Sequence, residues 1–320
     1  MIPVPLFRVF ALFCLVITTF GIAACDQKKE EPSTESTTAP AKPVVVATTG
    51  MVAELVRGVA GDLLEVHTLL DPGVDPHLYQ PSPASIKKLS KADAVFYNGL
   101  HLEGRMDEVF EGLERKGRII LAVTDAIPRT ELIPVGQGTY DPHVWMDVKL
   151  WASCAGIVVD TLSEKWPKHQ AAFAENGRQL DVRLQKLDAE IRAKTAALPE
   201  ASRVLVSTHD AFAYYGKTYG FRVVAVQGIS TVTEAGLADV TRVIDTIREL
   251  KVPAVFVESS VPRAVMERVS KDAGVKIGAE LFADALGNPG EMMLGFDVGT
   301  YPGMMLYNSS AIVAALATKP

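Results

Sequence analysis

The sequence predicts an α/β fold of two similar lobes, each built on a parallel β-sheet with helices and joined by one long rigid helix. Three observations predict this fold. Short apolar runs alternate with amphipathic stretches, as in parallel βαβ units. The pattern of the first half returns about 160 residues further along the chain. A long helical pattern separates the two halves.

The first lobe is predicted to span residues 44–165 and the second residues 199–320. In the first lobe we expect strands at 44–46, 63–70 and 94–97, and helices at 51–59 and 82–90. In the second lobe we expect strands at 204–206, 223–226 and 254–256, and a helix at 211–219. Ala254-Val255-Phe256 aligns with Ala94-Val95-Phe96, so the two lobes are expected to be alike.

Residues 166–198 are predicted to form the connecting helix. A helical stretch over 150–166 leads to Pro167, which suits the first turn of a new helix. Pro199 ends the connector, and an apolar stripe runs along one of its faces: Leu180, Leu184, Leu187 and Ile191. A helix of about 30 residues is about 45 Å long. We therefore expect a stiff rod that lets the lobes tilt rather than swing widely.

Residues 1–24 are predicted to be a secretory signal outside the fold. Arg8 precedes the apolar run 9–20, and small residues follow it up to Ile22-Ala23-Ala24-Cys25. The run is too short for a comfortable transmembrane helix. The last four residues resemble the bacterial lipobox, in which the signal is cut before a cysteine that is then lipidated. Cys25 is therefore the predicted lipidation site.

Residues 25–43 are predicted to be the lipidated cysteine and a disordered tether. The segment is polar and rich in Pro, Ser, Thr and Glu, so it cannot bury enough apolar surface to fold. Once Cys14 is removed and Cys25 is lipidated, Cys154 is the one remaining thiol, which excludes an intrachain disulfide. We expect an extracytoplasmic domain anchored to the cell membrane, on the periplasmic face in a Gram-negative cell.

Composition and charge exclude several classes of protein. Of the 320 residues, 48% are hydrophobic and 22% charged, as in ordinary globular proteins. The net charge is −6 and no run of five Lys or Arg occurs, so nucleic acid is not an expected partner. No phosphate-binding loop or dinucleotide fingerprint is present. The chain is therefore not expected to supply an ATPase.

Polar side chains follow the predicted strands, where open parallel sheets bind their ligands. The tripeptide Asp-Pro-His occurs twice, at 75–77 and 141–143. Proline stiffens the backbone before each His and favours an extended Asp, so each loop presents an imidazole beside a carboxylate. His209 comes just after the strand at 204–206, and Asp284 follows the run 280–283. Each lobe thus supplies two candidate donors.

Three imidazoles and one carboxylate form a ligand set that suits Zn²⁺ well and Mn²⁺ acceptably. The predicted metal ligands are His77, His143, His209 and Asp284. Glu258 ends a predicted strand and is expected to hydrogen-bond a ligand rather than bind the ion. Three further residues are weaker candidates for such a supporting role: His101, Asp75 and Asp141. His67 and His169 are interpreted as ordinary structural or surface histidines.

Several motifs together resemble the metal-binding solute-binding lipoproteins of bacterial zinc and manganese ABC importers, the cluster A-I family. They are V-A-T-T-G, G-V-D-P-H-L-Y-Q-P-S, Y-N-G-L-H-L-E, D-P-H-V-W-M-D, S-T-H-D-A-F-A-Y-Y and G-T-Y-P-G-M-M-L-Y-N. The resemblance implies two lobes on a rigid helix with the metal between them. By motif it implies the same four ligands: His77, His143, His209 and Asp284. It also implies an ABC permease and its ATPase as partners that receive the ion.

The sequence lies between the zinc and manganese patterns of that family. Some zinc-dedicated members carry a His-rich acidic loop between the first two ligands, but residues 102–141 contain no His. Some manganese members place Glu where this chain has His209. The Irving–Williams order favours Zn²⁺ at a nitrogen-rich site. Zinc is therefore the expected ion, with manganese as the alternative.

Two other functions compete with metal delivery by a monomeric, non-enzymatic binding protein. A secreted zinc-dependent hydrolase would need an open coordination position and a base, for which Glu258 is the candidate. Four protein ligands and the lack of a His-Glu-x-x-His signature argue against it. The other alternative is a lipoprotein that binds an organic solute between its lobes.

Overall fold

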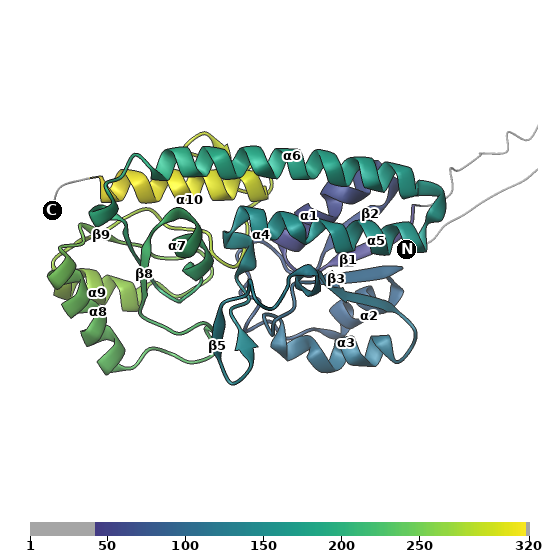
Figure 1. Ribbon diagram of the computed structural model, residues 1–320. Helices are drawn as coiled ribbons and strands as arrows, with labels where there is room; N and C mark the ends of the chain where they lie inside the picture. Colours follow the sequence, from purple (N-terminus) through teal and green to yellow (C-terminus); the bar gives the residue numbers. More distant parts are fainter. Residues whose placement is uncertain (1–41, 318–320) are drawn as a thin grey trace, which may run out of the picture. The chain divides into compact units, whose positions relative to one another are not determined.

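The computed structural model describes residues 42–317. The predicted signal, Cys25 and most of the predicted tether lie outside the described residues. Figure 1 shows two groups of strands and helices side by side, with two long helices, α6 (Gln170–Thr195) and α10 (Tyr301–Leu316), along one side of them. The chain is an α/β protein, as the alternation of short apolar runs and helical stretches predicts.

The first half contains a four-stranded parallel sheet in the order β2-β1-β3-β4. Its strands are β1 (Val44–Ala47), β2 (Glu65–Thr68), β3 (Ala94–Tyr97) and β4 (Ile119–Ala122). Its helices are α1 (Gly50–Ala60), α2 (Pro83–Lys91) and α3 (Asp107–Glu114). Val45, Val46 and Ala47 of the inner strand β1 are fully buried, because an inner strand of a parallel sheet is covered on both faces.

The second half repeats this arrangement. Its parallel strands are β7 (Val204–Ser207), β8 (Arg222–Ala225), β9 (Ala254–Val255) and β10 (Lys276–Ile277), and its helices are α7 (Ala213–Tyr219), α8 (Leu237–Leu250) and α9 (Ala264–Ala273). The amide of Phe256 donates to the carbonyl of Val206 at 2.9 Å, so the pair β7–β8 adjoins the pair β9–β10. The resulting order, β8-β7-β9-β10, matches β2-β1-β3-β4. The prediction of two similar parallel-sheet lobes is confirmed.

A long helix joins the two halves, as predicted. Helix α6 has 26 residues, which corresponds to a length of about 39 Å. It packs against α1, α4 (Val148–Ser153) and α5 (Ala155–Lys165) of the first half, and against α10. The predicted apolar stripe forms its buried face: Leu180, Leu184, Leu187 and Ile191. Pro167 lies in a separate 3-10 turn, Pro167–His169, just before α6.

The helical stretch predicted over 150–166 is divided into α4 and α5 at Cys154. The hydroxyl of Ser153 donates to the carbonyl of Leu150 at 2.6 Å, and the amide of Cys154 donates to Trp151 at 3.1 Å. A side-chain hydroxyl that takes a helical carbonyl weakens the helical ladder. Hydrophobic periodicity does not reveal this break. The thiol of Cys154 is buried, forms no disulfide and donates to the carbonyl of Leu150 at 3.8 Å.

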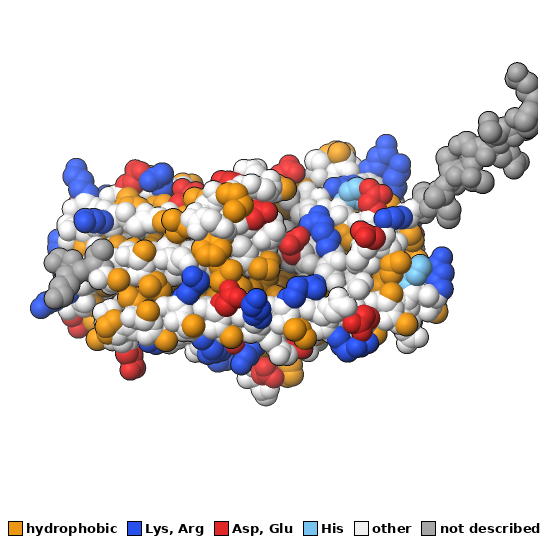
Figure 2. All heavy atoms as spheres, turned by 90° about the horizontal axis from the view of Figure 1, so that it is seen from above, with side chains coloured by type: hydrophobic (Ala, Val, Ile, Leu, Met, Phe, Trp, Pro, Cys, Tyr) orange, Lys and Arg blue, Asp and Glu red, His pale blue; other side chains and the backbone are white. Residues whose placement is uncertain are grey.

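Two short antiparallel hairpins complete the described fold: β5 (Pro134–Gly136) with β6 (Thr139–Tyr140), and β11 (Met292–Met293) with β12 (Phe296–Asp297). Figure 2 shows the face along α6 and α10, on which basic and acidic side chains are interspersed with apolar ones. Between residues 42 and 317, none of the helices combines the length and the apolar character that a membrane span requires.

Candidate metal centre

The two Asp-Pro-His tripeptides form the same local turn. His77 lies in the loop between β2 and α2, and the Asp75 carboxylate accepts its backbone N–H at 2.8 Å. His143 precedes the 3-10 turn Val144–Met146, and the Asp141 carboxylate accepts its backbone N–H at 2.9 Å. A hydrogen bond from the backbone N–H of residue i+2 to the carboxylate of an Asp at position i stabilises such a turn locally. Each imidazole thus follows a turn that its own tripeptide stabilises.

The other two donors come from the second half. His209 begins the loop after β7. Asp284 follows Leu281, which forms a parallel bridge with Glu258 beside the strands of that half. Asn308 of α10 accepts the amide of Phe282 at 3.0 Å and donates to its carbonyl at 2.7 Å. These two hydrogen bonds hold the segment that carries Asp284 against α10.

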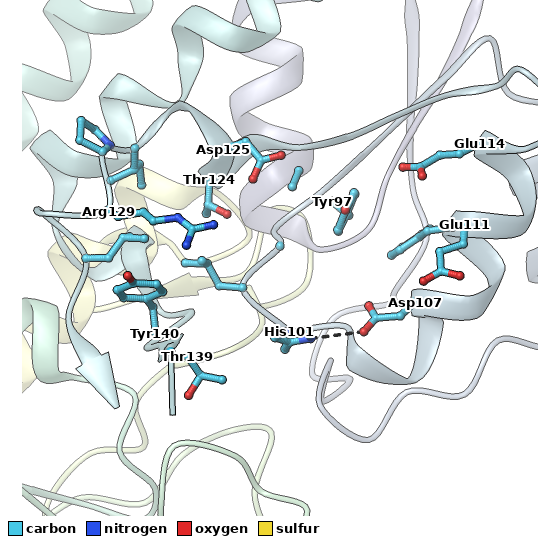
Figure 3. Close-up of a pocket in the computed structure, with 18 residues that line it drawn as sticks. Tyr97, His101, Asp107, Glu111, Glu114, Thr124, Asp125, Arg129, Thr139 and Tyr140 are labelled. Carbon is cyan, nitrogen blue, oxygen red and sulfur yellow. Dashed lines mark hydrogen bonds and ion pairs between the residues drawn. The ribbon is translucent and has the colours of Figure 1, made fainter. Parts of the chain in front are cut away.

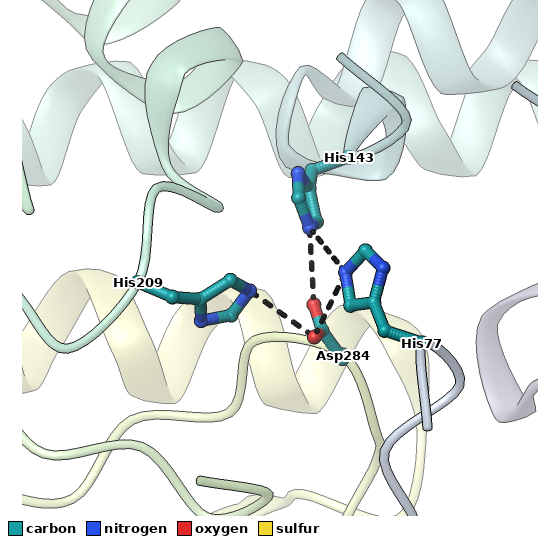
Figure 4. A group of neighbouring side chains, drawn as sticks. All are labelled: His77, His143, His209 and Asp284. Carbon is teal, nitrogen blue, oxygen red and sulfur yellow. Dashed lines mark hydrogen bonds and ion pairs between the residues drawn. The ribbon is translucent and has the colours of Figure 1, made fainter. Parts of the chain in front are cut away.

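All four predicted ligands converge on one point (Figure 4). Their donor atoms lie within 4.8 Å of one another. The Nε2 atoms of His77 and His143 are 3.3 Å apart, and the Asp284 carboxylate is 3.5 Å from Nε2 of His143. It is 3.7 Å from Nε2 of His77 and 3.1 Å from Nε2 of His209. Ligands at zinc–nitrogen distances of about 2.0–2.1 Å around a tetrahedron are about 3.3 Å apart, so the cluster has the dimensions of a tetrahedral zinc site.

The four side chains are buried, and the donor atoms of two of them, His209 and Asp284, lack a hydrogen bond. The exposed fraction is 5% for His77, 1% for Asp284 and 0% for His143 and His209. Within residues 42–317, neither carboxylate oxygen of Asp284 nor Nε2 of His209 has a hydrogen bond of proper geometry. A buried carboxylate without hydrogen bonds is costly unless a cation lies beside it. The cluster is therefore built to receive a positive ion.

Carboxylates orient two of the three imidazoles. Asp141 contacts Nδ1 of His143 at 2.7 Å, and Glu258 contacts Nδ1 of His209. The other oxygen of Glu258 accepts the backbone amides of Thr208 and His209 at 2.8 and 3.0 Å. A carboxylate that holds Nδ1–H leaves the Nε2 lone pair free for a metal. Glu258 and Asp141 thus each contact Nδ1 of a clustered imidazole, and Asp75 contacts the backbone of His77.

The pKa values of the cluster reflect burial and mutual charge. Burial lowers the pKa of His77 to about 4, against the attraction of Asp284. Burial alone would lower the pKa of His209 as well, but the carboxylates of Glu258 and Asp284 outweigh it and raise that pKa well above its ordinary value. Burial likewise opposes ionisation of Asp284, yet the neighbouring imidazoles, above all His209, hold its pKa well below the usual range. The two neighbouring carboxylates thus favour the doubly protonated, cationic form of the His209 ring when no metal is bound.

His101 is not brought to this cluster. Its side chain is 74% exposed and its Nδ1 lies 3.3 Å from the Asp107 carboxylate. It lines a separate cavity of about 780 Å³. Figure 3 shows His101 there, with Asp107 and Arg129 among the other lining residues. His67 pairs with Glu65 at 3.0 Å and is 40% exposed. Neither histidine contacts any of the four clustered side chains.

Three buried residues that support the cluster were not anticipated from the sequence. Asn98 donates to the carbonyl of Pro142 at 3.0 Å, and Tyr214 donates to the carbonyl of Asp141 at 3.0 Å. Trp145 donates to the carbonyl of Ala283 at 2.9 Å. Asn98 directly follows β3, so its place at a strand end was an available signal. Tyr214 and Trp145 donate to backbone carbonyls. Because every residue has a carbonyl, the sequence does not indicate which one these side chains bind.

Comparison with known proteins places residues 45–315 in the family model described as zinc-uptake complex component A, periplasmic. The chain is 41% identical over 281 residues to the zinc-binding protein TroA of Treponema pallidum, covering 86% of this chain and 89% of that protein. It is 40% identical over 308 residues to the manganese-binding lipoprotein MntA of Bacillus subtilis, covering 94% and 97%. The solved structure of the Treponema pallidum periplasmic zinc-binding protein TroA superposes with a TM-score of 0.83, covering 87% of this chain and all of the other.

Proposed function

Because the chain belongs to the family of periplasmic zinc-uptake component A proteins, the metal-binding components of ABC importers, we propose that it captures a single divalent transition-metal ion outside the cytoplasm and delivers it to such an importer. The convergence of four buried donor side chains carries this proposal. The proposed ligands are His77, His143, His209 and Asp284. Each half of the chain supplies two of them, so one ion joins both halves.

We propose Zn²⁺ as the preferred ion. Three imidazole nitrogens and one carboxylate match the ligands and tetrahedral dimensions of zinc sites. The Irving–Williams order places Zn²⁺ above Mn²⁺ for such donors. Manganese is the alternative, because one relative is named a zinc-binding protein and another a manganese-binding lipoprotein. A bidentate Asp284 would raise the coordination number and favour Mn²⁺.

We propose that the protein is a monomer tethered to the membrane through a lipid on Cys25. The relative from Bacillus subtilis is named a lipoprotein. The proposed division of the chain is a signal over 1–24, a tether over 25–43, lobes over 44–165 and 199–320, and a connecting helix over 166–198. The proposed partners are an ABC permease and its ATPase, which would take the ion from this protein.

We propose that the cluster binds its ion without catalysis. A hydrolytic zinc keeps one coordination position open for water, whereas four protein donors fill a tetrahedral shell. Glu258, the one candidate for a general base, is occupied by His209 and two backbone amides. These contacts leave Glu258 no free oxygen with which to activate a water molecule.

Metal analysis tests this function directly. The protein purified from metal-balanced medium is expected to contain about one zinc per chain, and titration calorimetry should show one high-affinity zinc site. A Zn/Mn competition would then rank the two ions. Absence of metal binding would contradict the proposal, and turnover of ester or peptide substrates by the zinc-loaded protein would favour the hydrolase.

A further inference from the structure

Three of the four clustered donors are fixed to one another by buried hydrogen bonds. Trp145, two residues after His143, donates to the carbonyl of Ala283, which precedes Asp284. Glu258 holds both the ring and the backbone amide of His209. These contacts do not involve the ion. His143 and the segment before Asp284 are thus joined by a contact between protein groups, and His209 is held by Glu258, which pairs with Leu281 near Asp284.

His77 is held differently. In the other two imidazoles, Nδ1 has a carboxylate partner: Asp141 contacts Nδ1 of His143, and Glu258 contacts Nδ1 of His209. Within residues 42–317, Nδ1 of His77 has no hydrogen-bond partner. Apart from the cluster itself, the polar contact that positions His77 is the bond from its backbone N–H to Asp75. The placement of this donor thus depends on the placement of Asp75.

Asp75 is in turn tied to the second half of the chain. One carboxylate oxygen accepts the N–H of His77 at 2.8 Å, and the other accepts the hydroxyl of Thr231 at 2.6 Å. Thr231 is 156 residues away in sequence and 8% exposed. A single carboxylate therefore links the loop that carries His77 to the loop that precedes α8.

The loop that carries Thr231 has few other polar anchors. Gly228 accepts the amide of Asp210 at its start, and the amide of Gly236 is held by Asp239 at its end. Between them, residues 229–235 make no backbone-to-backbone hydrogen bond to any described residue. Val232, next to Thr231, is 55% exposed. The bond from Thr231 to Asp75 is therefore the principal polar contact that keeps this loop against the loop of His77.

We propose that Thr231 is a positioning residue that, through Asp75, holds His77 on the metal and sets how long the ion stays bound. This inference rests on the proposed function, because it assumes that His77 binds the ion. Loss of the hydroxyl would leave the second oxygen of Asp75 without its partner and free the loop of His77. The ion would then be held by three fixed donors and one donor that departs more readily.

The variant Thr231→Val tests this role because it removes the hydroxyl and keeps the shape. Zinc release from the full-length protein into a fluorescent chelator is followed by stopped flow. We expect release to be about 10–100-fold faster, the usual effect of losing a group that orients a metal ligand. Thr231→Ser should restore the wild-type rate. The matched control, Thr233→Val, alters an exposed threonine two residues away and should release zinc at the wild-type rate.

A double variant separates positioning from a general structural role. Because Thr231 acts through His77, adding Thr231→Val to His77→Ala should not accelerate release further, although the lost hydrogen bond lowers the metal-free melting temperature equally in both backgrounds. Release by Thr231→Val at the wild-type rate would overturn the inference, as would additive effects of the two substitutions on the release rate in the double variant. If the wild-type protein itself bound no zinc, the proposed function would fail instead.

Discussion

The indole nitrogen of Trp145 donates to the carbonyl oxygen of Ala283 at 2.9 Å, and both residues are fully buried. The carbonyl of Trp145 accepts the hydroxyl of Tyr301 at 2.6 Å. Trp145 therefore ties together the segment after His143, the segment before Asp284 and the start of α10. The separation of these two donors is set by the fold rather than by an ion.

The Trp145→Phe variant should lower both stability and zinc affinity. Phenylalanine keeps most of the ring but leaves the buried carbonyl of Ala283 without a donor, which costs about 1–3 kcal/mol. The free energy of unfolding measured in urea without metal should fall by this amount, and calorimetry should show weaker zinc binding. The control is Trp151→Phe: Trp151 is 1% exposed and makes no side-chain hydrogen bond within residues 42–317. Equal zinc affinity in the two variants would contradict a special role for Trp145.

Removing a proposed ligand should weaken metal binding far more than removing a surface histidine. His209→Ala deletes one of the four proposed donors, so zinc affinity should fall by more than the about 10–100-fold typical of losing a supporting group. His67→Ala, which alters a half-exposed imidazole outside the cluster, should leave affinity unchanged. An unaltered calorimetric titration of His209→Ala would remove that residue from the site.

Much of the fold follows from local pattern. The strands predicted at 94–97 and 204–206 are Ala94–Tyr97 and Val204–Ser207 in the structure, and the helices predicted at 51–59 and 82–90 are Gly50–Ala60 and Pro83–Lys91. The predicted strand over 63–70 is shorter in the structure, Glu65–Thr68. Periodicity cannot locate its ends, because residues on either side of a strand can be apolar for other reasons. Boundaries depend on hydrogen bonds between distant segments.

The clustered side chains could be chosen from the sequence because strand ends and repeated tripeptides mark them. The contacts that connect the two halves could not. Thr231 and Asp75 are 156 residues apart, and nothing local marks a threonine in a polar loop as a partner for a carboxylate. The acceptor of the hydrogen bond from Trp145 is the backbone carbonyl of Ala283. Every residue has such a carbonyl, so the residue type at position 283 does not predict this contact. Contacts of this kind follow only from the packed structure.

Zinc binding at pH 7 should release about one proton from His209. The carboxylates of Glu258 and Asp284 raise the pKa of His209 well above its ordinary value, against the effect of burial, so the metal must displace a proton from it. The pKa of His77 is lowered to about 4, chiefly by burial, and that ligand is already neutral at pH 7. Titration calorimetry in two buffers of different ionisation enthalpy measures the release. No proton release at pH 7 would contradict the raised pKa of His209.

The pKa shifts of His209 and His77 make the stability of the metal-free protein depend on pH in opposite directions. The raised pKa of His209 contributes stability that is complete below about pH 6.5, the unfolded value, and is lost as pH rises through the folded pKa. The lowered pKa of His77 makes stability fall as pH decreases from about 6.5 toward 4. Zinc affinity should rise with pH until His209 loses its proton. Urea unfolding without metal and zinc titrations, both across pH 4–9, measure these two dependences.

Exchange of one imidazole for a carboxylate should shift selectivity toward manganese. His209→Glu alone would place two carboxylates together, because Glu258 contacts the ring that is removed. The double variant His209→Glu/Glu258→Gln avoids that repulsion while keeping an acceptor for the amides of Thr208 and residue 209. Oxygen donors suit Mn²⁺ and imidazoles suit Zn²⁺, so zinc affinity should fall more than manganese affinity.

Competition dialysis should show the zinc-to-manganese ratio of affinities reduced by at least about tenfold. The single variant Glu258→Gln is the control: it retains all three imidazoles and should keep the wild-type ratio. An unchanged ratio in the double variant would mean that the identity of this donor does not set the preference.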